Sequence, residues 1–193
     1  MNLIERVKKT EFLGREFLTW LWYRSESREG VFDLGELGTV EILFEGKMTL
    51  EPDGEDWGDM VTCAGAGTRS GEARFALTRG KKVTHASLRL LKGDDEWSFS
   101  LDAAWLNISG LKVPKVMQDA REDADGLFYE RMFLIEQPIA VVNVLFAEFI
   151  RLRVSPEWHQ DELAALEEWI RRGRLVAEGS KESSHQQGGE TPC

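Results

Sequence analysis

The fold is constrained most by the segment VTHASLRLLKGDDEWSFSL. Within it, Trp97, Phe99 and Leu101 alternate with polar residues, which is the period-two pattern of a strand with one buried face. The turn sequence KGDD separates this stretch from the apolar run before it. We therefore predict an antiparallel hairpin of strands at 83–91 and 96–101. A chain with such a hairpin builds an antiparallel sheet and covers its apolar face.

Further strands are predicted on both sides of this hairpin. Alternating apolar and polar residues at 40–50 predict a second hairpin, which turns at Gly46 and Lys47. A short strand is expected at 60–63. The aromatic and branched residues of 128–135 predict one more strand.

Helices are predicted in four places. An early helix at 11–24 has apolar residues at helical spacing. A short basic helix follows the glycine-containing stretch GAGTRSG and stops at Gly80. Two C-terminal helices are expected to begin at Pro138 and Pro156, because the first helical position needs no backbone N–H.

These elements predict an α+β fold. An antiparallel sheet of hairpins packs with the early helix, the short basic helix and the two C-terminal helices. The chain has 193 residues, 42% of them hydrophobic, so a single domain at 1–176 can bury a core. The polar residues 177–193 are predicted to form a disordered tail.

Composition limits the compartment and the ligand. Cys63 and Cys193 are the two cysteines and no zinc spacing occurs, so a reducing cytoplasm is expected and no cofactor or metal is predicted. The apolar run at 17–23 is too short for a membrane span. The formal net charge of -10 argues against a general DNA coat, so any polyanion site must be local.

Cations gather in one part of this acidic chain. Between Arg69 and Lys92 there are seven basic residues against one acid, Glu72. Phosphate binding needs mobile cations on one surface, and a helix followed by a Lys-Lys step into a strand can supply them. The alternative is that these side chains solvate a helix end and offset nearby acids, as most charge runs do.

Tryptophans offer a second route to a ligand. Trp57, in an acidic loop, is predicted to be exposed, whereas Trp97 and Trp105 are predicted to be buried beside alternating strands rather than to stack on bases. An exposed apolar patch around Trp20 and Trp22 would instead favour a protein-interaction module without DNA binding.

A nuclease is the other alternative. The acidic stretches at 53–59 and 119–125 could in principle hold Mg²⁺ for phosphodiester cleavage. Such runs in glycine-containing loops are mostly solvated turns, so we do not predict an enzyme, although a metal-dependent exonuclease stays open.

Four motifs occur in a fixed order between residues 12 and 153: FLTWLWYRSES, RSGEARFALTRGKKVTHASLRLL, WSFSLDAAWLNISGLKV and FLIEQPIAVVNVLFAEFI. This ordered series resembles the recombination-associated protein RdgC family. Its sharpest part is Gly80-Lys81 followed by Val83-Thr84. Gly65, Ala66 and Gly67 stand where family members can have basic and amide side chains, so that phosphate contact is not carried over.

The resemblance implies a function and partners. Proteins of this family bind duplex DNA without marked sequence preference as a ring-shaped homodimer that limits access of the recombinase RecA to DNA, and some are labelled as exonucleases. We therefore expect a nucleoid-associated, non-catalytic DNA-binding modulator of recombination that antagonises RecA. The predicted DNA-binding residues are Arg69, Arg74, Arg79, Lys81, Lys82, Thr84, Arg89, Lys112 and Lys115.

Overall fold

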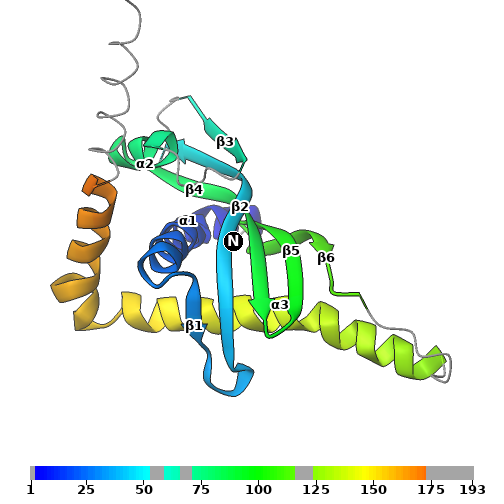
Figure 1. The fold of residues 1–193 in the computed structure, drawn as a ribbon. Helices are drawn as coiled ribbons and strands as arrows, with labels where there is room; N and C mark the ends of the chain where they lie inside the picture. The colour runs from blue at the N-terminus through cyan, green and yellow to red at the C-terminus, as the bar shows by residue number, and fades with distance from the viewer. Residues whose placement is uncertain (1–2, 53–58, 66–70, 116–123, 173–193) are drawn as a thin grey trace, which may run out of the picture.

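The protein has the predicted α+β architecture (Figure 1). A computed structural model describes residues 3–52, 59–65, 71–115 and 124–172, with the side chains of 3–11 left out. One antiparallel sheet has the strand order β1-β2-β4-β5-β6, and β3 also pairs with β2. The strands are β1 (Val31–Asp33), β2 (Thr39–Pro52), β3 (Val61–Gly65), β4 (Lys81–Lys92), β5 (Asp95–Asp102) and β6 (Asn107–Lys112).

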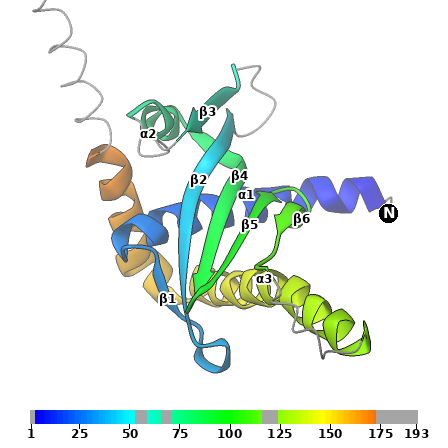
Figure 2. The same ribbon diagram turned by 45° about the vertical axis from the view of Figure 1, so that its right-hand side comes forward.

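Helices pack against this sheet. They are α1 (Leu3–Ser27), the short α2 (Gly71–Thr78), α3 (Ala124–Arg153) and a last helix at 156–172 that contains the π-helical turn η2 (Trp158–Glu162); a 3-10 turn, η1 (Gly35–Leu37), precedes β2. Both α1 and α3 lie behind the sheet in Figure 1, and Figure 2 shows the N-terminal part of α3 extending past it. One face of the sheet therefore carries the main core.

The predicted central hairpin is confirmed. Strands β4 and β5 pair in a register that places Leu88 opposite Phe99 and Leu90 opposite Trp97, and all four side chains are buried. The residues between them point to the other face, as period-two alternation requires.

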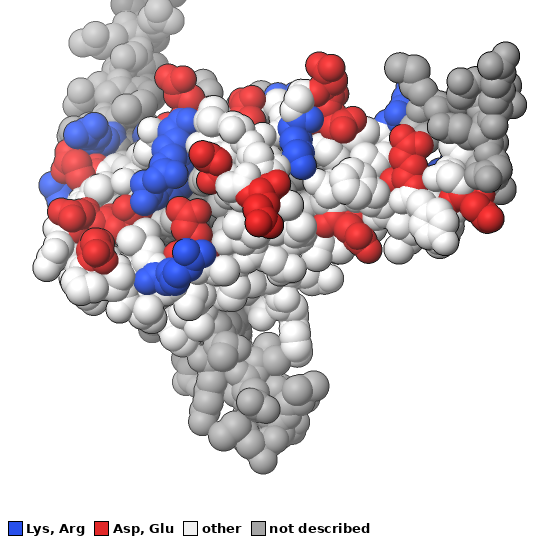
Figure 3. Space-filling model, turned by 90° about the horizontal axis from the view of Figure 1, so that it is seen from below, with Lys and Arg blue, Asp and Glu red and all other residues white. Residues whose placement is uncertain are grey.

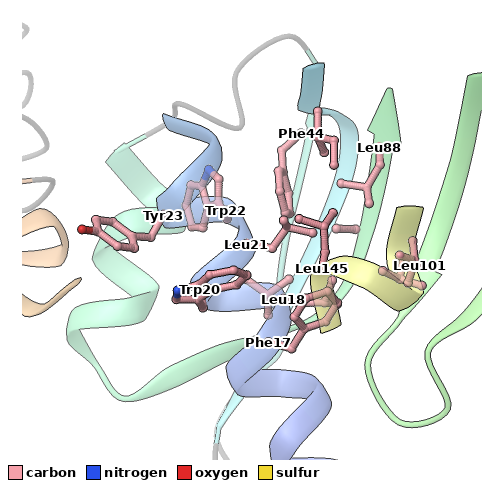
Figure 4. Packing of buried hydrophobic residues seen from close by; sticks show 14 of the residues in the cluster. Phe17, Leu18, Trp20, Leu21, Trp22, Tyr23, Phe44, Leu88, Leu101 and Leu145 are labelled. Atoms are coloured by element: carbon pink, nitrogen blue, oxygen red, sulfur yellow. The ribbon is translucent and has the colours of Figure 1, made fainter. Parts of the chain in front are cut away.

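Several of the largest core side chains come from α1 and pack against the sheet and α3 (Figure 4). Phe17, Trp20 and Trp22 are almost fully buried, and the ring of Phe17 meets that of Phe149, on α3, at 5.7 Å between centroids. The interaction patch that the sequence suggested around Trp20 and Trp22 is therefore wrong, because α3, the last helix and the sheet cover both indoles.

The predicted second hairpin is also wrong. Residues 39–52 form one long strand, β2, whose register against β4 shifts between Phe44 and Met48. Gly46 has a φ of 89°, which a β-bulge of this kind can use without a Cβ penalty. The glycine thus bends the strand where the sequence pattern indicated a reversal.

The predicted strand at 128–135 is in fact part of α3, and Pro138 lies inside that helix rather than at its start. Buried residues of α3 recur at Leu134, Pro138, Val141 and Leu145, which is helical spacing. Burial of this stripe overrides the strand propensity of the aromatic and branched residues.

A specific contact accommodates this internal proline. Pro138 has no N–H, so the carbonyl of Leu134 loses its helical partner. The indole Nε1 of Trp97, on β5, donates to that carbonyl oxygen at 2.8 Å. A side chain of the sheet therefore supplies the hydrogen bond that the Leu134 carbonyl cannot receive from Pro138.

This contact gives a first prediction. Trp97→Phe should lower the free energy of unfolding by about 1–2 kcal/mol beyond the lost packing, because it leaves a buried carbonyl unpaired. In a Pro138→Ala background the same change should cost less, since the new amide can take over the carbonyl. Urea unfolding of the four chains measures this coupling, and strictly additive losses would contradict the role of the indole.

The last helix begins at Pro156, as predicted, and is tied to α1. Glu162 is buried and accepts a hydrogen bond from Trp20 Nε1 at 2.7 Å, and it forms an ion pair with Arg24, whose Nε is 2.7 Å from the same carboxylate oxygen. At the start of this helix, the pKa of Glu157 is lowered because the Ser155 side chain hydrogen-bonds to its carboxylate.

By length and composition alone, the stretch Asp125–Arg153 of α3 could also cross a membrane. Its second half, however, supplies core residues such as Val141, Leu145 and Phe149, which is equally typical of a central helix in a folded domain.

Candidate nucleic-acid interface

Arg74, on α2, is engaged within the fold. Its guanidinium pairs with the carboxylate of Glu26, at the end of α1, and lies over the ring of Trp169 at 5.2 Å from the centroid. Only 21% of the Arg74 side chain is exposed. This cation therefore joins α1, α2 and the last helix.

Lys82, at the start of β4, meets the middle of α1. Its Nζ is 3.5 Å from Glu16 Oε1, and the second oxygen of the same carboxylate is 3.0 Å from Arg153 Nε. One carboxylate thus pairs with two cations, one from β4 and one from α3.

The turn from α2 into β4 presents two more cations. Arg79 is exposed and its guanidinium lies over the ring of Phe75 at 5.1 Å, while Lys81 Nζ donates to the backbone oxygen of Asp59. A carbonyl does not neutralise the ammonium, so both charges remain available to an anion. Thr84 is buried instead, and its hydroxyl is 3.3 Å from the carbonyl oxygen of Thr49.

Three strands bring two other predicted residues into one line. The register places Arg89 of β4 opposite Ser98 of β5, and Ser98 opposite Lys112 of β6. Arg89 also pairs with Glu45 at 3.1 Å, with 34% and 46% of the two side chains exposed. Exposed pairs of this kind contribute little free energy, so the guanidinium can exchange this carboxylate for another anion.

Hydroxyl groups lie beside this line. Ser87, Ser100 and Ser109 occupy matching positions on β4, β5 and β6, and the hydroxyls of Ser87 and Ser100 are 3.2 Å apart. We call this surface the hydroxyl face; it consists of Ser87, Arg89, Ser98, Ser100, Ser109 and Lys112.

The hydroxyl face is directed away from the core. Its β4 and β5 members alternate with buried residues such as Leu88 and Phe99, which point toward α1 and α3. In Figure 1 the strands lie in front of these two helices, and no described helix lies over the hydroxyl side of β5 and β6. The sequence contained a signal for this face, because serines alternate with Trp97 and Phe99. Which serines of β4, β5 and β6 lie side by side, however, follows only from the strand register.

The remaining cations are dispersed. Lys92 donates to the side-chain oxygen of Gln137 at 2.9 Å, and Lys115 is exposed beyond the end of β6. Arg69 and Trp57 lie outside the described residues. The six basic residues of this stretch that the structure describes therefore do not form one patch; Lys112 joins Arg89 instead.

Most of the acidic stretches at 53–59 and 119–125 lies outside the described residues. Among the described residues, no group of three His, Cys, Asp or Glu side chains could hold a metal ion. Trp97 is buried, as predicted, but the same prediction for Trp105 is wrong, since 62% of it is exposed. The alternation that buries the β5 residues ends in the turn after Asp102, where the backbone of Leu106 has a φ of 50°.

Comparison with known proteins adds no relative. No protein-family model matches this sequence, and no curated protein matches it either.

Proposed function

We propose that the protein binds duplex DNA without sequence preference through the hydroxyl face. The observation that carries this proposal is the line of Arg89, Ser98 and Lys112 across three adjacent strands. Serine hydroxyls and the two cations are the side-chain types that contact phosphate and sugar oxygens without reading bases. Arg79 and Lys81 would add phosphate contacts at the far end of β4.

In this proposal the protein is a non-catalytic modulator of recombination. The RdgC-like order of motifs supports that role, since limiting access of a recombinase such as RecA needs only occupancy of the duplex. Nucleoid association in the cytoplasm would follow from the same binding. Labelled duplex incubated with and without Mg²⁺ tests the non-catalytic part, because cleavage that depends on the metal would indicate a nuclease.

A paired substitution on the hydroxyl face tests the binding site. The Arg89→Gln/Lys112→Gln variant should bind every duplex sequence more weakly, and the slope of log K against log salt should fall by about two, about one per lost phosphate contact. Mobility shifts at several salt concentrations measure both quantities.

The matched control removes two charges elsewhere. Arg171→Gln/Arg172→Gln changes the net charge equally on the last helix, where 67% and 74% of these side chains are exposed. Its binding should stay close to that of the parent. Equal losses of DNA affinity in both variants would show that the effect comes from net charge alone. If the parent protein retains no DNA at low salt, the proposed function is refuted.

A further inference from the structure

An uncovered apolar stripe runs along the N-terminal half of α3. Its members are all large and at least 39% exposed, and they are Phe128, Tyr129, Met132, Phe133, Ile135 and Ile139. Monomeric soluble proteins seldom leave so many large side chains in one contiguous exposed patch without a use for them. Figure 3, which looks at the molecule from the side of α3, shows uncharged surface with mixed charges around it.

The spacing of this stripe identifies the kind of surface that it fits. Phe128, Met132, Ile135 and Ile139 follow one another at intervals of four, three and four residues. This is the seam of a coiled coil, in which alternating core positions of one helix insert between those of another. The stripe lies on another side of α3 than the buried residue Leu134. The sheet can therefore pack on one side of α3 while a partner helix packs on the stripe.

We infer that the occupant is a second copy of α3, packed in parallel. In a parallel two-stranded coiled coil, the residue before one core position faces the residue five positions later on the other helix. Arg131 and Glu136 stand at those two positions, and both are exposed. A two-fold axis along the seam therefore forms the Arg131–Glu136 pair twice. In the antiparallel arrangement with the same core layers, Arg131 would face Pro138 and gain no partner.

Other occupants fit the stripe less well. The sequence from 173 to 193 offers only Leu175 and Val176 as large apolar residues, too few to cover the seam. An anionic membrane would be repelled by the acids beside it, Asp125, Glu130 and Glu136. A second copy supplies both the apolar seam and the opposite charge.

The first experiment measures mass against concentration. Sedimentation of the full chain should give twice the chain mass of 22.0 kDa at high concentration and dissociate on dilution. Met132→Glu/Ile135→Glu should be monomeric, with unchanged circular dichroism because both side chains already contact solvent. Val154→Glu is the matched control, since this exposed apolar residue lies outside the stripe and its variant should still dimerise. A parent that is monomeric at every concentration would overturn the inference.

Charge exchange tests the pairing. Arg131→Glu or Glu136→Arg alone should raise the dimer dissociation constant by about tenfold, since each creates two like-charged pairs. The Arg131→Glu/Glu136→Arg double variant should restore the parent value. Two losses that simply add would show that these residues do not face each other.

Cross-linking tests direction. In a Cys193→Ser background, where Cys63 is buried, Ile135→Cys should form an intermolecular disulfide because a core position meets itself across a parallel axis. In the antiparallel arrangement position 135 meets position 132. A disulfide that appears only when Met132→Cys and Ile135→Cys are combined would therefore overturn the parallel assignment.

Discussion

Gly14→Ala is expected to lower the free energy of unfolding by about 3 kcal/mol, although alanine in a helix ordinarily stabilises it by about 1 kcal/mol relative to glycine. Gly14 lies in α1, and a Cβ built there would be 1.8 Å from the backbone oxygen of Ala103. That oxygen belongs to the turn that follows β5 and cannot rotate away as a side chain would. The helix and the turn must therefore separate.

Thermal unfolding gives the measurement, and a loss of this size should lower the melting temperature by about 6–12 °C in a domain of this length. Gly126→Ala is the control, because this glycine is exposed within α3 and the same substitution there should leave stability unchanged or raise it. If Gly14→Ala melts at or above the parent temperature, α1 does not approach the sheet as closely as the fold requires.

Elements whose pattern has one physical cause could be predicted from the sequence. In the β4–β5 hairpin, alternation and turn chemistry agree, and the structure places Trp97 and Phe99 in the core as the pattern requires. The early helix and the helix start at Pro156 have the same consistency between local signal and burial.

Elements with conflicting signals were mispredicted. A glycine such as Gly46 is compatible with a bulge or with a turn. Only the pairing of β2 with both β3 and β4 determines that a bulge forms here. Pro138 could begin a helix or interrupt one, and the choice depends on Trp97, which is 41 residues earlier in the sequence. Such contacts are tertiary, so no local pattern contains them.

The candidate site divides in the same way. Cation density in the sequence correctly indicated charge near the start of β4, but it could not indicate which cations already have carboxylate partners. Arg74 and Lys82 meet acids of α1, whereas Arg89 has only a more exposed partner, Glu45, and is aligned with Lys112 by strand register. Cations that are paired inside the fold contribute to stability, whereas cations on the exposed strand face are the candidates for contact with an anionic ligand.

Among the charges that are paired within the fold, Glu26 should matter most. Glu26→Ala should lower the free energy of unfolding by about 3–4 kcal/mol. The Glu26 carboxylate pairs with Arg74 and accepts hydrogen bonds from Trp22 Nε1 at 3.0 Å and Trp169 Nε1 at 3.1 Å. Removing it leaves a guanidinium and two indole N–H groups without this acceptor, in a region where the Glu26 side chain is only 17% exposed. Glu167→Ala, an exposed acid on the last helix, should change stability by less than about 0.5 kcal/mol.

The double variant Glu26→Leu/Arg74→Met separates charge from packing. Replacing both partners by apolar groups removes the unpaired guanidinium, so denaturant unfolding should recover part of the loss seen in Glu26→Ala. The same variant bears on DNA, because Arg74 is held inside the fold and its removal should leave the affinity of the folded protein for duplex unchanged. Full additivity of the two losses would show that the ion pair is not coupled, and weaker DNA binding by the folded double variant would return Arg74 to the phosphate-binding surface.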